Sequence, residues 1–394
     1  MNKELLKTGV QEFINTNISA DIVSVLLKKS IFDKISSQEL AQQIEAKNSC
    51  RKKLPTWFNT PKIYYPKKLN IEQTSSEITA RYKSQIIDGK SLLDLTGGFG
   101  VDSYFFSHKI EEIVHCETNE NLSEIATYNF NILDAGHIKT IATNGLDFLK
   151  QYRHNFDWIY VDPSRRNDLK GKVFLLADCL PNVPEYLDLL FEKSSKVLIK
   201  TSPLLDISIG ISELKFVKEI HIVSIKNEMK ELLWVLQKGF KGEVLIKTID
   251  LKKITPAIFD FQLSEEKSAI SDFAMPKQDH YLYEPNTAIL KSGAFKLVGA
   301  RLQLKKLHQH THLYTSPERI NFPGRRFKIN QIISYTKKNI RQLQLEKANI
   351  TTRNFKESVA SLRKKYKIKD GGNLFLFFTR NENGNFIVLN CSKL

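Results

Sequence analysis

Seven apolar segments between residues 91 and 238 constrain the fold of this chain more than any other feature. In chain order they are SLLDL, EIVHCE, IKTIAT, FDWIYVD, KVLIKT, EIHIVSI and ELLWVLQ, and helical stretches separate most of them. Most are nearly continuous apolar runs rather than strict alternations, which is typical of strands covered on both faces. The pattern predicts a largely parallel α/β sheet, and the last two segments are close enough in sequence to form an antiparallel pair.

Helical signals precede this sheet and a mixed pattern follows it. Residues 1–60 carry apolar residues at helical spacing, and Ser36 and Glu39 are placed like a capping box. Residues 74–88 predict one more helix. Near the C-terminus, LFLFFTRNENGNFIVLN predicts a hairpin whose Asn383-Gly384 pair suits a tight turn.

Positive charge is concentrated in the last quarter of the chain. Residues 291–394 contain 22 Lys and Arg against 5 Asp and Glu, whereas residues 1–290 contain 37 against 38. A module that binds a polyanion concentrates charge in this way, and a general basic bias would spread it. We therefore expect the C-terminal region to bind nucleic acid, chiefly through Arg363, Lys364 and Lys365 on the polar side of a predicted helix. The alternative is a solvated face without a partner.

Composition excludes several other classes of protein. About 18 consecutive apolar residues would be needed for a membrane-spanning helix, and no such run occurs. With no signal peptide visible either, we expect a cytoplasmic protein without a membrane partner. The four cysteines are far apart, which argues against a disulfide framework or a cysteine zinc site. His308, His310 and His312 share one side of a predicted strand, but no acid or cysteine completes a ligand set, so we expect no metal.

Polar residues stand at the ends of four successive predicted strands. Asp94 ends the first, Glu117 the second, Asn144 follows the third, and Asp162 and Pro163 follow the fourth. Ligands of open α/β sheets bind beyond the carboxyl ends of the strands, so these residues predict one crevice. Taken singly, Glu117 is equally compatible with a helix cap and Asn144 with a turn.

The segment DLTGGFGVDS adds a glycine-rich turn to this crevice. Gly97, Gly98 and Gly100 precede a predicted helix, where a missing side chain lets the backbone approach a ligand and the helix N-terminus favours negative charge. A dinucleotide fingerprint would require a glycine at Ser103, which disfavours a nicotinamide cofactor. Glu117 is about twenty residues further on, where an acid can accept hydrogen bonds from ribose hydroxyls.

These segments resemble bacterial class I S-adenosylmethionine-dependent methyltransferases with a C-terminal THUMP-like domain. The resemblance covers most of the chain and rests on LNIEQTSSEITARYKSQII, DLTGGFGVDS, VDPSRR, KVLIKTSPLLD, NEMKELLW, YLYEPNTAILKSGAF and TTRNF with LRKKYKIKDGGNLFLF. It implies an α/β fold in four parts. These are a helical N-terminal segment (1–73), a Rossmann-like methyltransferase domain (74–240), a linker with a small ferredoxin-like α+β domain (241–320) and a THUMP-like α+β domain (321–394).

The resemblance also implies a cofactor, a partner and residue roles. S-adenosylmethionine would lie with its methionine part near Asp94 and Gly98, its ribose near Glu117 and its adenine near Asn144. Thr96 and Gly100, in the same glycine-rich turn, would also bind this cofactor. Thr96 replaces the usual first glycine, a change that recurs in nucleic-acid enzymes of the class. THUMP domains bind RNA, so the implied enzyme is a methyltransferase acting on RNA, with base and ribose both open and no obligate protein partner. The alternatives are an RNA-binding protein with a non-catalytic Rossmann scaffold and a methyltransferase acting on a protein.

The turn VDPSRR departs from the Asp-Pro-Pro-aromatic signature of base amino-methyltransferases. Ser164 and Arg165 stand where the second proline and the aromatic ring would be. Asp162 can still accept a hydrogen bond from an amine, but a base would need a ring from elsewhere. We consider Trp57, Phe58 and Tyr64 for that ring. Arg165 and Arg166 suit phosphate instead, or salt bridges to neighbouring acids. Cys179, in a predicted helix, is expected to be a buried thiol and not a nucleophile.

A second hypothesis for this turn is a group like that of ribose 2′-O-methyltransferases. Lys83, Asp162, Lys200 and Glu231 occupy similar topological positions, before the first strand, after the fourth, after the fifth and at the start of the last. Two lysines placed together would lower the pKa of at least one, which could then accept the hydroxyl proton. The alternative is that Lys200 and Glu231 pair only with each other.

Overall fold

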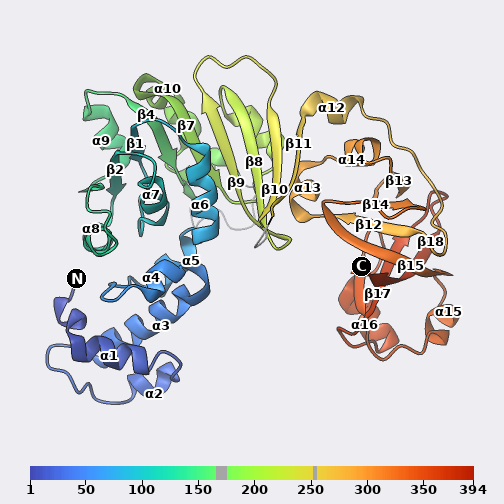
Figure 1. The fold of residues 1–394 in the computed structure, drawn as a ribbon, viewed down its shortest axis with the longest axis horizontal. Helices are drawn as coiled ribbons and strands as arrows, with labels where there is room; N and C mark the ends of the chain where they lie inside the picture. The colour runs from blue at the N-terminus through green and yellow to red at the C-terminus, as the bar shows by residue number, and fades with distance from the viewer. Residues whose placement is uncertain (166–174, 252–254) are drawn as a thin grey trace. The chain divides into compact units, whose positions relative to one another are not determined.

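The computed structural model describes residues 1–165, 175–251 and 255–394, without the side chain of Arg165. The chain divides into two compact units, whose elements are labelled in Figure 1. The first unit contains residues 1–218 and 233–241, and the second contains residues 219–232 and 242–394. Strand β9 (Glu228–Gln237) therefore contributes residues to both units.

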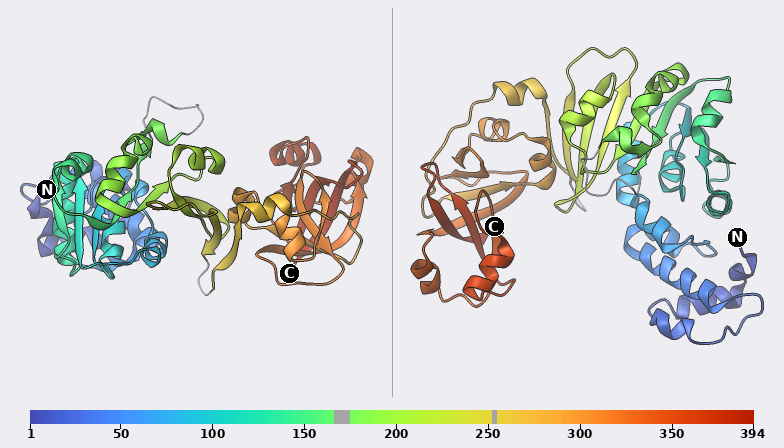
Figure 2. Two further views of the ribbon diagram at one scale, coloured as in Figure 1. Left: turned by 90° about the horizontal axis from the view of Figure 1, so that it is seen from above. Right: turned by 180° about the vertical axis from the view of Figure 1, so that it is seen from behind.

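The first unit begins with short helices that share a core with the helices flanking the sheet. As predicted, α3 starts at a capping box: Ser36 Oγ accepts from the Glu39 N–H (3.2 Å), and the Glu39 carboxylate accepts from the Ser36 N–H (2.8 Å). Trp57 and other buried side chains from these helices pack against α7 (Val101–Phe106) and α8 (Glu120–Ile132). The N-terminal helices are drawn in blue in Figure 2. The N-terminal helices are η1 (Lys3–Leu6), α1 (Thr8–Thr16), α2 (Ile22–Leu26), α3 (Ser37–Lys53), α4 (Pro55–Asn59), α5 (Lys68–Gln73) and α6 (Glu77–Ile86).

A mainly parallel sheet forms the centre of the first unit. Its strands follow the order β9-β7-β4-β1-β2-β3, and the pairs from β7 to β3 are all parallel. The strands are β1 (Ser91–Asp94), β2 (Glu112–Glu117), β3 (Lys139–Ala142), β4 (Phe156–Val161) and β7 (Ser194–Thr201). Five of the six residues of β4 are buried, which explains its continuous apolar sequence. The other elements are α9 (Gly145–Gln151), β5 (Ser164–Arg165), η3 (Leu176–Asp178), β6 (Cys179–Leu180), α10 (Val183–Lys193) and α11 (Ile207–Glu213).

The second unit contains most of β8 (Val217–Ile225), the hairpin partner of β9. Strand β8 is joined to β9 by Lys226 and Asn227, whose φ angles of 50° and 66° are typical of a tight hairpin turn. The predicted pairing of the last two apolar segments is thus confirmed. Strand β10 (Leu245–Leu251) pairs in parallel with β8, and β11 (Ala257–Gln262) pairs antiparallel with β10.

A seven-stranded sheet forms the rest of the second unit. Its order is β13-β14-β12-β15-β18-β17-β16, in which β12 and β15 pair antiparallel. The predicted C-terminal hairpin is confirmed, since β17 and β18 pair antiparallel around Gly384, whose φ is 78°. The strands are β12 (Tyr281–Pro285), β13 (Lys305–His308), β14 (Thr311–Ser316), β15 (Gly324–Ser334), β16 (Asn349–Thr352), β17 (Leu374–Arg380) and β18 (Phe386–Lys393). The helices of this unit are α12 (Leu263–Ser268), α13 (Thr287–Ser292), α14 (Leu297–Arg301), α15 (Lys337–Gln342) and α16 (Val359–Tyr366).

The predicted α/β class is confirmed by these two sheets and their helices. Among the described helices, none combines the length and hydropathy that crossing a bilayer demands.

Candidate active site

The three glycines after β1 make the turn that opens the site. A Cβ on Gly97 would lie 2.2 Å from His115 Nε2, and one on Gly100 would lie 2.4 Å from Phe130 Cζ, so packing excludes a side chain at both positions. Gly98 differs, because the nearest atom to its Cβ position is 3.9 Å away, although its φ of 58° favours glycine. The turn therefore leaves free space beside Gly98, where a ligand can meet the backbone.

Glu117 at the end of β2 fastens this turn. Its carboxylate accepts a hydrogen bond from the N–H of Gly98 (2.9 Å) through Oε2 and from the N–H of Asn119 (2.7 Å) through Oε1. Each carboxylate oxygen can accept further hydrogen bonds. The side chain is half-buried. Glu117 thus holds the glycine turn and keeps acceptor capacity at the edge of the sheet.

Asn144 caps the helix that follows β3. Its Oδ1 accepts from the N–H of Leu146 (2.9 Å), while the residue itself is exposed. The next residue, Gly145, lies so close to β1 that a Cβ would be 2.4 Å from the carbonyl oxygen of Leu95. The start of α9, just after β3, therefore lies directly against the end of β1, on the side where the crevice is predicted.

Asp94 is a buried carboxyl group beneath the glycine turn. It is 1% exposed and accepts hydrogen bonds from the Thr96 N–H (3.0 Å) and the Ser103 hydroxyl (2.6 Å). Burial raises the pKa of Asp94 to about 7, because the surroundings disfavour its charged form. Asp94 can therefore change charge near neutral pH.

The Asp162 turn is tied to the glycine turn and to β7. The N–H of Asp162 donates to Thr96 Oγ1 (2.7 Å), and the Asp162 carboxylate forms an ion pair with the Lys200 ammonium at the end of β7. Pro163 is buried, and Ser164 in β5 pairs with Leu180 in β6. The structure thus brings together Thr96, Asp162 and Lys200 from three strand ends.

Asp102, on α7, is a charged residue that the sequence reasoning missed. Its carboxylate lies 3.2 Å from the Lys83 ammonium and accepts hydrogen bonds from the hydroxyls of Ser75 (2.7 Å) and Tyr160 (2.8 Å). Burial is the largest single influence and works to raise the pKa of Asp102, but the positive charges of Lys83 and Lys200 and the hydrogen bonds from Ser75 and Tyr160 together hold that pKa below its usual value. The observed series of charges is therefore Lys83, Asp102, Lys200 and Asp162. A signal was present in the sequence, because a lysine on the buried face of a helix requires a counter-charge.

Two further residues of the predicted charged group are buried, and the two arginines of the Asp162 turn are described only in part. Lys83 is fully buried in α6, and Glu231 is 3% exposed in β9. The side chain of Arg165 and the whole of Arg166 lie outside the described residues.

Two expectations about neighbouring side chains are wrong. Trp57 and Tyr64 are buried in the core of the first unit, where the Trp57 ring packs edge-on against Tyr104 (centroids 4.9 Å apart), so neither supplies an exposed ring for a base. Phe58 is partly buried against the same core. Cys179 is a buried thiol, as expected, but it begins strand β6 and not a helix, because η3 ends at Asp178.

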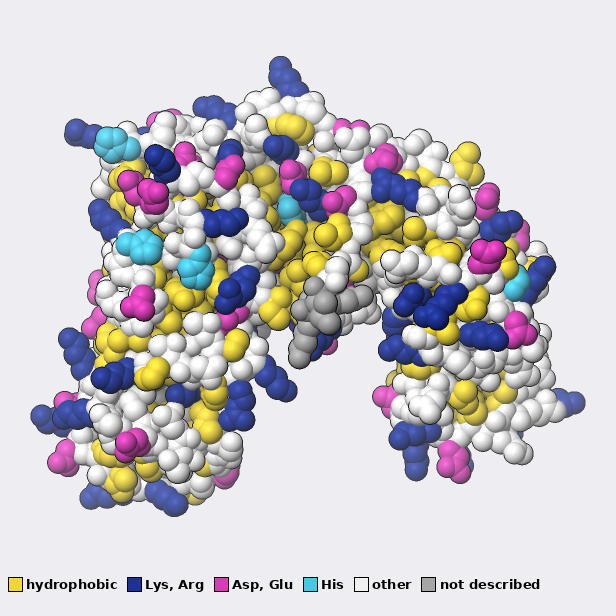
Figure 3. Space-filling view, viewed as in Figure 1, with side chains coloured by type: hydrophobic (Ala, Val, Ile, Leu, Met, Phe, Trp, Pro, Cys, Tyr) yellow, Lys and Arg dark blue, Asp and Glu magenta, His cyan; other side chains and the backbone are white. Residues whose placement is uncertain are grey.

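The predicted RNA-binding cations have different surroundings. Arg363 donates to the carbonyl oxygens of Ala348 (3.2 Å) and Ile368 (3.3 Å) and also contacts the Asp370 carboxylate. Lys365 pairs with Glu357 at 3.0 Å. Lys364 is exposed. Figure 3 shows further Lys and Arg side chains gathered where Figure 1 labels β12 and β15.

The three histidines do not share one strand, which corrects the prediction. His308 ends β13, His312 lies in β14, and the turn between the two strands contains His310. The His312 ring stacks on Phe295 with centroids 3.5 Å apart, and burial lowers the pKa of His312 to about 4. Among the described residues, no cluster of three or more His, Cys, Asp or Glu side chains could hold a metal ion.

The sequence and the fold of this chain are similar to those of known proteins. A family model described as a ferredoxin-like domain matches residues 281–323, and one described as THUMP domain-like matches residues 324–393. No curated protein matches the sequence. A solved structure named putative methyltransferase, from Porphyromonas gingivalis W83, is 32% identical and covers 100% of this chain and 98% of its own, with a TM-score of 0.88.

Two further solved structures match less than half of this chain. A putative methyltransferase from Streptococcus mutans, in complex with SAH, is 12% identical over 41% of this chain and 96% of its own (TM-score 0.31). A putative RNA methyltransferase from Pyrococcus horikoshii is 15% identical over 48% of this chain and 89% of its own (TM-score 0.31). The full-length similarity to the P. gingivalis protein shows that this chain belongs to its family, class I methyltransferases with a ferredoxin-like and a THUMP-like domain in their C-terminal part.

Proposed function

We propose that this protein is an S-adenosylmethionine-dependent methyltransferase that acts on RNA. The observation that carries the proposal is the turn at Gly98, where open space adjoins a backbone N–H held by Glu117, in a chain that belongs to a methyltransferase family. The basic THUMP domain-like region supports RNA as the substrate.

The residues around the turn fit the proposed cofactor. Free space beside Gly98 admits a ligand, and the ionised Asp94 carboxylate would favour the positively charged methionine part. Glu117 would accept hydrogen bonds from the ribose hydroxyls, and Asn144 would lie near the adenine. Thr96 and Gly100 shape the turn. When bound, the cofactor supplies a methyl group on a positively charged sulfur.

The acceptor end of the site is proposed to be the Asp162 turn. Asp162 and Lys200 would contact the acceptor group, with Lys83 and Glu231 as further members of the same charged group and Arg165 on a neighbouring phosphate. A hydroxyl acceptor loses its proton as its oxygen bonds the methyl carbon. Lys200, which is paired with Asp162 as an ammonium, would first give up a proton to water and would then take the proton of the hydroxyl. An amino acceptor would instead hydrogen-bond to the Asp162 carboxylate. The position of the methyl group in the product, on a base or on a ribose, distinguishes these two acceptors.

Two measurements test this function. Titration calorimetry should show binding of S-adenosylmethionine and of S-adenosylhomocysteine, and Glu117→Ala should weaken it by about tenfold through loss of hydrogen bonds to a charged acceptor. Radiolabelled methyl transfer to RNA from cells that lack the gene, followed by nucleoside mass spectrometry, should identify the methylated atom. An absence of cofactor binding would leave an RNA-binding protein with a non-catalytic scaffold, and labelling of protein alone would replace RNA as the substrate.

A further inference from the structure

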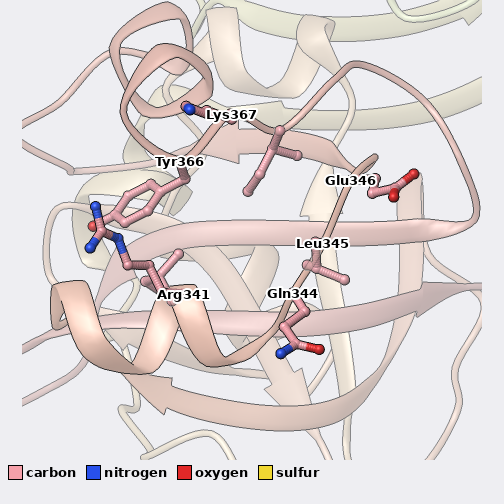
Figure 4. A pocket seen from close by; sticks show the side chains of 8 residues that line it. Arg341, Gln344, Leu345, Glu346, Tyr366 and Lys367 are labelled. Carbon is pink, nitrogen blue, oxygen red and sulfur yellow. The ribbon is translucent and has the colours of Figure 1, made fainter.

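A cavity of about 250 Å³ lies in the THUMP domain-like region, between the turn after α15 and the end of α16. Figure 4 shows the side chains that line it, with Tyr366 and Arg341 at one end and Glu346 at the other. Drug-sized ligands usually occupy cavities larger than about 300 Å³. This cavity is therefore large enough for one small group and not for a drug-sized ligand.

The lining combines an apolar floor with an aromatic wall. Ile340 and Ile368 are buried, Leu345 is half-buried, and Tyr366 is half-buried with its hydroxyl directed to that of Tyr335 (3.3 Å). A nucleobase is planar and stacks on such a ring regardless of its identity. The edge-on contact with the Tyr335 ring (centroids 6.4 Å apart), together with this hydrogen bond, orients the Tyr366 ring before any ligand arrives.

Two cations at the edge of this cavity are available to a ligand. Arg341 and Lys367 are exposed, and within the described ranges neither side chain forms an ion pair or a hydrogen bond. Arg363 and Lys365, in contrast, are engaged with Asp370 and Glu357. A guanidinium or ammonium group next to a stacked base is placed to meet the adjoining phosphate.

We propose that this cavity binds one base of a single-stranded RNA, stacked on Tyr366, with its phosphate held by Arg341 and Lys367. The inference rests on the proposed RNA function and makes it more specific. It assigns to the THUMP domain-like region a site that recognises an unpaired nucleotide, in addition to general attraction between the basic surface and phosphates. Residues 291–394 contain 22 Lys and Arg against 5 Asp and Glu. This positive charge favours a polyanion such as RNA over a partner that is neutral or positively charged.

The test compares a short fluorescent oligouridine with its abasic counterpart, which keeps the phosphates and lacks the bases. The full-length wild-type protein should bind oligouridine about tenfold more tightly than the abasic strand. Tyr366→Leu should abolish this preference, and Tyr366→Phe should retain it. Arg341→Gln should weaken binding of both strands several-fold and reduce the salt dependence, whereas Lys338→Gln, which removes the same charge from the same helix outside the cavity, should have a smaller effect.

A second measurement uses only the wild-type protein, so that a folding defect of a variant cannot decide the outcome. An oligonucleotide carrying 5-iodouridine should crosslink to the peptide that contains Tyr366. Crosslinks confined to other regions, or equal affinity for the base-containing and abasic strands, would overturn the cavity proposal and leave RNA methylation standing. Failure of the wild type to bind either strand, together with no methyl transfer to RNA, would overturn both.

Discussion

The hydroxyl oxygen of Thr96 accepts a hydrogen bond from the backbone N–H of Asp162 at 2.7 Å. The residue that replaces the usual first glycine of the cofactor turn thus positions the turn proposed to hold the acceptor. We expect Thr96→Ala to leave the Asp162 N–H without this partner and to lower the methyl-transfer rate by about tenfold, equivalent to roughly 1.4 kcal/mol. Thr96→Ser, which keeps the hydroxyl, should restore most of the rate in single-turnover assays. Equal rates for the alanine and serine variants would contradict this role.

Lys200→Ala should abolish methyl transfer and leave cofactor binding unchanged, because Lys200 forms an ion pair with Asp162 in the turn proposed to hold the acceptor. Lys196→Ala is the matched control. Lys196 lies on the same strand and pairs with Asp88 at 2.6 Å, so its loss should affect neither property. Transfer near the wild-type rate by Lys200→Ala would exclude Lys200 from the chemistry.

Asp102→Asn should destabilise the protein by about 3 kcal/mol, since it removes the negative charge 3.2 Å from the fully buried ammonium of Lys83. Urea denaturation measures this loss. The double variant Lys83→Met with Asp102→Asn should recover part of it, because the buried ammonium that lost its counter-charge is then also removed. If the two single losses simply add, Lys83 and Asp102 do not stabilise each other.

The affinity for S-adenosylmethionine should increase as the pH rises through about 7. Burial raises the pKa of Asp94 to about 7, so its carboxyl group is neutral below that pH and negative above it, and a positively charged ligand favours the negative form. Folding stability should change in the opposite sense: a raised carboxyl pKa favours the folded state at low pH, and that advantage is lost as the pH rises from about 4 to about 7. Asp94→Asn should flatten both profiles, measured by calorimetry and by urea denaturation at several pH values.

Arg363→Ala should lower the stability of the C-terminal region by about 1–3 kcal/mol, because the guanidinium donates to two backbone carbonyls and contacts Asp370. Lys364→Ala, on the exposed side of the same helix, should change stability by less than about 0.5 kcal/mol.

RNA binding should fall steeply with added salt, and neutralising Arg363, Lys364 and Lys365 together should flatten that dependence. Stability measured for each single variant separates loss of phosphate contacts from loss of structure.

The sequence was sufficient to predict the elements that local patterns determine. Continuous apolar runs identified the strands of the first sheet, and the Ser36 and Glu39 pair identified the start of α3. Contacts between distant residues were beyond such patterns. Asp102 was given no role from the sequence, and only the packing of α6 against α7 shows that it faces Lys83. The same limit explains Trp57, whose ring the sequence left free and the structure buries.

The pairing of β12 with β15 has a consequence for how this protein can be divided. The boundary between the ferredoxin-like and THUMP domain-like matches, at residues 323 and 324, lies within one continuous sheet, because Leu282 on β12 is in register with Phe327 on β15. The buried Glu284 carboxylate on β12 also pairs with Arg325 and Arg353, both beyond that boundary. Cleavage there would expose an unsatisfied strand edge and an uncompensated charge on one side. The two matched regions should therefore unfold as one cooperative unit, in which amide hydrogens of β12 and β15 exchange with solvent together.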